Sequence, residues 1–251
     1  MLDFFKTKKL QRVLFIPDVH FPYNDKRYWK LLLKVAKAVG VEIIVILGDF
    51  IDCYSISRYS KDPRRTSNFK QEIQSAKAAI KELDKLNAKR KIYLNGNHET
   101  RIWSYIQDKA PELYGCFSLR ELLGVDDSWE WVEYKESTKV GKMYVTHDVG
   151  HAGMYAAQHT LNAFQDNVAF GHTHRGCVIY QGNVKGVPHV CLNAGWGGDV
   201  EKIDYMHKAK AKRDWMLGFG FGYLEKNGNI HAHFIPVINY RCVVDGELFE
   251  L

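Results

Sequence analysis

Short apolar runs that end in polar side chains recur along this chain. They lie at residues 12–16, 43–47, 91–94, 143–145 and 168–170. Each run has the length and composition of a buried strand, and each is followed closely by Asp, His or Asn. In open α/β sheets, ligands bind in the crevice beyond the carboxyl ends of the strands. We therefore expect the polar side chains that follow these runs to meet in space.

Helical periodicity fills the segments between the first strands. Apolar residues spaced three and four apart predict a helix over residues 26–39, which Gly40 ends. Asn68 and Gln71 have the spacing of a capping box, and a second helix is expected from there to about residue 87. This β–α–β order predicts parallel strands joined by right-handed crossovers.

The second half of the chain has a different pattern. Residues 100–135 predict two or three short helices, which we interpret as an insertion that overhangs the site. A helix is expected at about 153–164, and a basic excursion, helical or mobile, at about 199–215. Strands are expected at 129–134, 140–146, 167–171, 176–181, 187–193, 218–225 and 229–236. No repeat, linker or low-complexity block divides the chain, so we predict an α/β fold in one domain, residues 1–251.

Composition and charge narrow the class of protein. The chain is 46% hydrophobic and 25% charged, as in soluble globular proteins. It shows no signal-peptide pattern and no run of about 18 apolar residues, so no membrane association is expected. Its five cysteines are scattered and contain no C-x-x-C pair, which disfavours a thiolate metal site and predicts a cytoplasmic protein. The net charge of +6 permits an anionic partner such as nucleic acid without requiring one.

The polar groups at the strand ends are those that divalent metal ions prefer. Carboxylate oxygens and neutral imidazoles suit hard and borderline cations. Asp18 and His20 are two residues apart, as are His172 and His174, so in an extended segment each pair would face one side. The candidate ligands are Asp18, His20, Asp49, Asn97, His147, His172 and His174.

The ordered set D-x-H, G-D-x-x-D, G-N-H-E, H and G-H-x-H resembles the calcineurin-like metallophosphoesterase superfamily. All five blocks are present in order, within a strand framework from about residue 12 to residue 225. That superfamily includes protein phosphatases, nucleases and cyclic-nucleotide phosphodiesterases. The resemblance implies a two-sheet β-sandwich flanked by helices, in four layers, with the small helical insertion at about 100–135.

The resemblance also implies a role for each motif residue. By motif position, the first metal would be held by Asp18, His20 and His174, the second by Asn97, His147 and His172, with Asp49 bridging them. His98 matches the catalytic histidine near the leaving group, and Asp52 matches the carboxylate that orients it. Phosphate esters would be hydrolysed by metal-activated hydroxide, with His98 as an imidazolium that protonates the leaving group. We expect two divalent metal ions, with Mn²⁺ as the leading candidate and Fe, Zn²⁺, Ni²⁺ or Mg²⁺ as alternatives.

Several residues near the motifs have roles that the sequence leaves open. Arg101 and Arg175 directly follow motif blocks, so each is a candidate contact for the substrate phosphate or else a solvated surface arginine. His151, four residues beyond His147, is a candidate for lining the pocket. Glu99 either supports the site from behind the ligands or simply opens the following helix.

The substrate class rests on two basic runs, at 58–65 and 202–213, that lie beside tyrosines and a tryptophan. Cations that neutralise a backbone, combined with aromatic stacking platforms, are typical of nucleic-acid binding, although a solvated charged face is the commoner explanation of such runs. A protein-phosphatase branch carries arginine where this chain has Cys53, which disfavours a phosphoprotein substrate. The leading interpretation is a phosphoesterase acting on nucleic acid or nucleotides. The alternatives are a broad phosphomonoesterase and a non-catalytic scaffold; the oligomeric state stays open.

Overall fold

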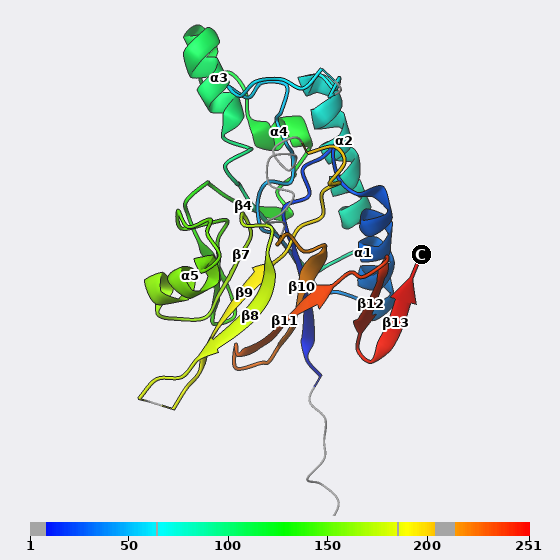
Figure 1. Cartoon of the computed structure of the whole chain (residues 1–251), viewed down its shortest axis with the longest axis vertical. Coiled ribbons are helices and arrows are strands. Elements are labelled where there is room, and N and C mark those ends of the chain that lie inside the picture. Colours follow the sequence, from blue (N-terminus) through cyan, green and yellow to red (C-terminus); the bar gives the residue numbers. More distant parts are fainter. Residues whose placement is uncertain (1–8, 64, 185, 204–213) are drawn as a thin grey trace, which may run out of the picture.

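The computed structural model describes residues 9–63, 65–184, 186–203 and 214–251, and in it two β-sheets pack face to face between layers of helices (Figure 1). This arrangement confirms the predicted α/β sandwich with helices on both sides. The strands of the first sheet, in spatial order, are β11 (Ile230–Pro236), β10 (Gly218–Leu224), β1 (Gln11–Ile16), β2 (Ile43–Ile46), β3 (Arg90–Leu94) and β4 (Trp129–Val132). Those of the second are β5 (Thr138–Val140), β6 (Met143–Val145), β7 (Val168–Phe170), β9 (His189–Ala194) and β8 (Gly176–Gln181).

Parallel pairing brings the strand ends that carry the motifs to one edge. In the first sheet β1, β2, β3 and β4 run parallel, whereas β10 and β11 are added antiparallel. In the second sheet β6, β7 and β9 run parallel, with β5 and β8 antiparallel at its edges. The carboxyl ends of β1, β2 and β3 therefore lie side by side, as do those of β6 and β7.

Three apolar clusters hold the layers together. The cluster between the sheets joins Phe15 and Val45 of the first sheet to Val145 and Leu192 of the second, all fully buried. The helices α1 (Lys26–Val39), α2 (Phe69–Asp84) and α4 (Leu119–Leu123) cover the outer face of the first sheet, together with the hairpin of β12 (Arg241–Val244) and β13 (Glu247–Glu250). The helix α3 (Arg101–Lys109) joins the same apolar cluster through Ile102 and Ile106. The helix α5 (Ala156–Phe164) packs on the outer face of the second sheet through Leu161.

The helix boundaries have local causes. The Asp25 carboxylate accepts hydrogen bonds from the backbone N–H groups of the first turn of α1, and Gly40 ends this helix in the left-handed conformation at φ 65°. The predicted capping box of Asn68 and Gln71 is present at the start of α2. The last residue of this helix is Asp84, so the predicted end was about three residues too late.

The segment 100–135 divides between the helical layer and the sheet. The helix α3 projects at the top of Figure 1 and is followed by the short helix η1 (Pro111–Leu113), whereas α4 packs against α2. The strand β4 extends the first sheet at the position of the strand expected at 129–134. The strand expected at 140–146 is instead the hairpin of β5 and β6.

Two further expectations concern other parts of the chain. Most of the predicted basic excursion, residues 204–213, lies outside the described residues. Within the described ranges, no helix combines the length and the apolar character needed to cross a bilayer.

Candidate active site

The loops after five strands deliver the motif residues to one buried centre. Apart from Asn97 and His172, which are half-buried, all of these side chains are buried. The residues are Asp18 and His20 after β1, Asp49 and Asp52 after β2, Asn97 and His98 after β3, His147 after β6, and His172 and His174 after β7. The structure thus places all the predicted ligands, together with the predicted catalytic pair, beyond the carboxyl ends of the strands.

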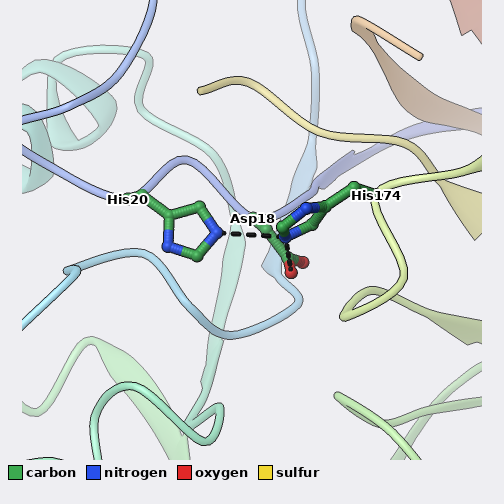
Figure 2. A group of neighbouring side chains, drawn as sticks. All are labelled: Asp18, His20 and His174. Atoms are coloured by element: carbon green, nitrogen blue, oxygen red, sulfur yellow. Dashed lines mark hydrogen bonds and ion pairs between the residues drawn. The ribbon is translucent and has the colours of Figure 1, made fainter. Parts of the chain in front are cut away.

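Asp18, His20 and His174 form the first group of potential ligands. One ligand atom from each lies within 4.8 Å of the others, and Figure 2 shows the three side chains turned toward one another. The Nε2 atom of His174 lies 3.0 Å from Asp18 Oδ2 and 3.1 Å from His20 Nε2. A carboxylate and two imidazoles converging in this way form a donor set that suits a divalent cation.

A second group consists of Asp49, His147 and His172, again with ligand atoms within 4.8 Å of one another. The amide oxygen of Asn97 lies 3.1 Å from His147 Nε2 and 2.9 Å from His172 Nδ1, so it faces the same point. His147 Nδ1 lies 2.7 Å from the carbonyl oxygen of Leu47. A donor hydrogen bond from Nδ1 would leave the lone pair of Nε2 directed at the centre, as in many metal-binding histidines.

Asp49 lies between these groups. Its ligand oxygens are close to His147 and His172 on one side and to His20 and His98 on the other, and Oδ1 accepts a 2.8 Å hydrogen bond from the backbone N–H of His98. Burial raises the pKa of Asp49 to about 7, and the negative charge of Asp18 adds to this effect although His147 opposes it. Cations at the two groups would relieve this cost, so the residues present fit a pair of divalent ions.

The backbone explains how the paired histidines are directed. His20, His172 and His174 have positive φ angles of 57°, 67° and 60°, so the extended geometry assumed from the sequence does not hold. Asp18 and His20 nevertheless share the first group, whereas His172 and His174 point into different groups. Non-glycine residues in the left-handed region are costly and cluster at functional sites.

Glu99 supports the site from behind and precedes α3 without belonging to it. Its buried carboxylate accepts hydrogen bonds from the backbone N–H groups of Asp49, Phe50 and Gly96 at 3.0, 2.9 and 2.9 Å. The hydroxyl of Tyr93 donates a further bond at 2.9 Å. Glu99 therefore ties the loop after β2 to the loop after β3 and fixes the position of Asp49.

Gly96 permits this close approach of the two loops. A Cβ atom at this position would lie 2.2 Å from Asp49 Oδ1 and 2.4 Å from Asp49 N. We expect Gly96→Ala to displace Asp49 and to weaken metal binding by at least about 10–100-fold, the usual effect of disturbing the support of a ligand. Equilibrium dialysis against Mn²⁺ would measure this, with Gly182→Ala as the control because a Cβ there meets open space. Unchanged Mn²⁺ affinity in Gly96→Ala would contradict the prediction.

His98 and Asp52 form the predicted pair. His98 Nδ1 lies 2.7 Å from Asp52 Oδ1, while Nε2 lies 2.8 Å from Nη2 of Arg101. Because a guanidinium can only donate, Nε2 accepts and the proton is on Nδ1. Burial and the positive charges of His20 and Arg101 lower the pKa of His98 to about 3. The imidazolium expected from the sequence is therefore not the form that this arrangement favours.

Arg65 is a functional candidate that the sequence did not single out. Its guanidinium pairs with Oδ2 of Asp52 and lies between the rings of Tyr23 and Tyr54, 3.7 and 3.5 Å from their centroids. Only 5% of its side chain is exposed. Arg65 therefore holds the carboxylate that in turn holds His98. The signal in the sequence was only membership of a basic loop, because Asp52 lies earlier in the same irregular loop, where no periodic pattern relates the two side chains.

A cavity of about 730 Å³ opens above these residues. Arg101 and Arg175, the two arginines that directly follow motif blocks, line it together with Trp215. The Arg175 guanidinium forms an ion pair with Asp214 and donates a 2.7 Å hydrogen bond to the carbonyl oxygen of Ala152. Arg175 therefore links these two segments at the edge of the cavity. His151 is not among the described residues that line this cavity. The centre of its ring lies 4.7 Å from that of His159.

Comparison with known families agrees with the fold and the site. Residues 11–176 match the family of calcineurin-like phosphoesterases. This stretch is more than half of the chain, and the chain belongs to that family. Among its described residues, His and Asp side chains lie in clusters that are candidate ligands for the divalent metals that this family uses.

Individual relatives come from several sources. The Gene 54 proteins of Mycobacterium phages D29 and L5 are 27% and 26% identical over 270 and 268 residues, covering 96% of this chain and 99% of each relative. Among solved structures, Vps29 from Entamoeba histolytica is 15% identical with a TM-score of 0.47, covering 95% of this chain and 96% of its own. The E. coli phosphoesterase Yfce is 14% identical with a TM-score of 0.43, covering 89% and 98%.

Proposed function

We propose that this chain is a binuclear metal-dependent phosphoesterase whose substrates are phosphodiesters of the nucleic-acid or nucleotide class. The observation that carries this proposal is the placement of Asp49 between two groups of potential metal ligands, beneath a cavity that also holds the His98–Asp52 pair. The family membership of the chain is consistent with it.

Each residue of the centre then has a role. Asp18, His20 and His174 would hold one cation, Asn97, His147 and His172 the other, and Asp49 would contact both. When bound, such cations, with Mn²⁺ as the expected metal, polarise a phosphoryl oxygen and lower the pKa of a water.

Arg101 and His98 would act on the substrate itself. A phosphate ester that enters the cavity meets the Arg101 guanidinium, which donates to its oxygens and leaves His98 Nε2 facing the leaving group. An anion beside the imidazole favours its charged form, so His98 would carry a proton at Nε2 while Asp52 holds Nδ1. Proton donation by a residue placed in this way assists departure of the alkoxide.

The substrate class and location rest on separate observations. The cavity is lined by Arg101, Tyr54, Tyr59 and Trp215, which combine a cation with aromatic rings in the manner of nucleic-acid sites. Cys53 occupies the position where a protein-phosphatase branch has arginine, which supports a diester over a phosphoprotein. All five cysteines are free, as expected of a protein in the reducing cytoplasm.

Hydrolysis of chromogenic esters tests the proposal. With Mn²⁺ we expect the chain to hydrolyse bis(p-nitrophenyl) phosphate faster than p-nitrophenyl phosphate, to lose this activity with a chelator and to regain it with Mn²⁺. Hydrolysis of the monoester alone would favour the broad phosphomonoesterase. Stoichiometric Mn²⁺ binding without turnover of either ester would favour the non-catalytic scaffold.

A further inference from the structure

A second cavity continues outward from the candidate active site. It has a volume of about 690 Å³ and shares Ser57, Tyr59, Asn97 and Arg101 with the first cavity. One wall is the loop between β2 and α2, and the other is α3. In Figure 1 this loop, drawn in cyan, and α3 both lie in the upper part of the molecule. The two cavities together form a groove, which we call the α3 groove where it lies beside that helix.

The α3 groove follows one face of its helix. Arg101, Ser104, Tyr105 and Asp108 line it, at the spacing of one helical face. Ile102 and Ile106, which lie elsewhere on the helix, are buried in the core. With a rise of 1.5 Å per residue, the polar face extends about 10 Å outward from Arg101. This is further than a single phosphate group can reach.

The lining has the chemistry of a site for a flexible polyanion with flat groups. Arg58, Arg101 and Lys109 place cations along the groove, against the single carboxylate of Asp108. Two aromatic rings are open to solvent in it, since Tyr59 is 61% and Tyr105 44% exposed. Cations that follow a phosphate backbone and aromatic rings on which bases stack are the two elements of single-strand recognition.

We propose that the α3 groove binds single-stranded nucleic acid that extends from the phosphate at the candidate active site, with Tyr105 as a stacking platform and Arg58 and Lys109 as backbone contacts. This inference rests on the proposed function, because it places a substrate strand on both sides of Arg101. A base can stack on a tyrosine whatever its identity, so the groove predicts little sequence preference.

Binding of a labelled strand tests the proposal independently of catalysis. We would measure the affinity of a fluorescein-labelled oligothymidylate by fluorescence anisotropy, with a chelator present to prevent cleavage. Loss of one stacking platform is worth about fivefold to 150-fold in Kd, and we expect Tyr105→Ala to weaken binding within that range. The matched control is Tyr180→Ala, because Tyr180 is 64% exposed on β8 and lines neither cavity.

A second variant tests the backbone contact. Lys109→Ala is expected to reduce the slope of log Kd against log salt concentration by about 0.7, the contribution of one neutralised phosphate in a single strand. Lys81→Ala on α2, which lies outside both cavities, is the control and is expected to leave the slope unchanged.

The outcomes separate this inference from the proposed function. Equal affinity of the wild type and Tyr105→Ala for the oligonucleotide would overturn the assignment of the groove. It would also be overturned if Tyr105→Ala lost affinity for a phosphopeptide but kept its affinity for the oligonucleotide. Hydrolysis of bis(p-nitrophenyl) phosphate, measured separately, decides the proposed function. Diester hydrolysis without an effect of Tyr105→Ala on strand binding would therefore refute the groove alone.

Discussion

His98→Ala is expected to lower kcat on bis(p-nitrophenyl) phosphate by about 10²–10⁴-fold while the protein keeps its bound Mn²⁺. This loss of rate is the usual contribution of a proton donor that is positioned beside the leaving group. The metal is expected to stay bound because the imidazole of His98 belongs to neither proposed ligand set. His98 Nδ1 is held by Asp52 at 2.7 Å, and Nε2 faces Arg101. Steady-state kinetics together with metal analysis of the same preparation would check both parts.

The control for this variant is His231→Ala. His231 is an exposed histidine on β11, 2.9 Å from Glu225 and remote from the cavity, so its removal should leave kcat as in the wild type. A kcat for His98→Ala within twofold of the wild-type value would remove His98 from the chemistry. Loss of Mn²⁺ from His98→Ala would instead show that this residue is a ligand.

Asp49→Ala is expected to abolish the paired metal site, so that the bound Mn²⁺ falls from two ions per chain to at most one. The physical reason is that, among the described residues, Asp49 lies close both to His20 of the first ligand set and to His147 and His172 of the second. A binuclear centre uses its two ions as one clamp on the phosphoryl group. We expect diester hydrolysis to fall by at least about 10³-fold, more than for loss of a single proton donor of average effect. Atomic absorption after gel filtration gives the stoichiometry.

Asp49→Asn separates the charge of this residue from its shape. The amide oxygen can still accept the hydrogen bond that His98 N–H donates to Oδ1, but it cannot neutralise two cations. Asp49→Asn should therefore keep the unfolding temperature closer to that of the wild type than Asp49→Ala does, and still lose the second ion. Two tightly bound ions in Asp49→Asn would refute the bridging role.

Much of the fold could be predicted because the relevant signals are local. The apolar runs before Asp18, Asp49 and Asn97 are strands, and the capping box at Asn68 starts α2 as expected. The strand expected at 140–146 fails for an equally local reason. Gly141 turns the chain at φ 58°, which divides the run into the antiparallel pair β5 and β6.

The candidate site was predictable only in part. Motif order identified the residues that converge, but their directions depend on backbone angles that a periodic pattern does not contain. The left-handed His172 and His174 send neighbouring side chains into different ligand groups. Contacts within and between irregular loops were likewise invisible, because no periodic pattern brings Arg65 to Asp52 in the loop after β2. His98 meets Asp52 only when the loops after β3 and β2 pack together.

The most direct test is anomalous diffraction at the manganese edge from crystals soaked in Mn²⁺. We expect two peaks about 3.5–4 Å apart, with Asp49 touching both ions, one bound by Asp18, His20 and His174 and the other by Asn97, His147 and His172. A single peak, no peak, or two ions without Asp49 between them would contradict the central claim that these side chains form one binuclear centre.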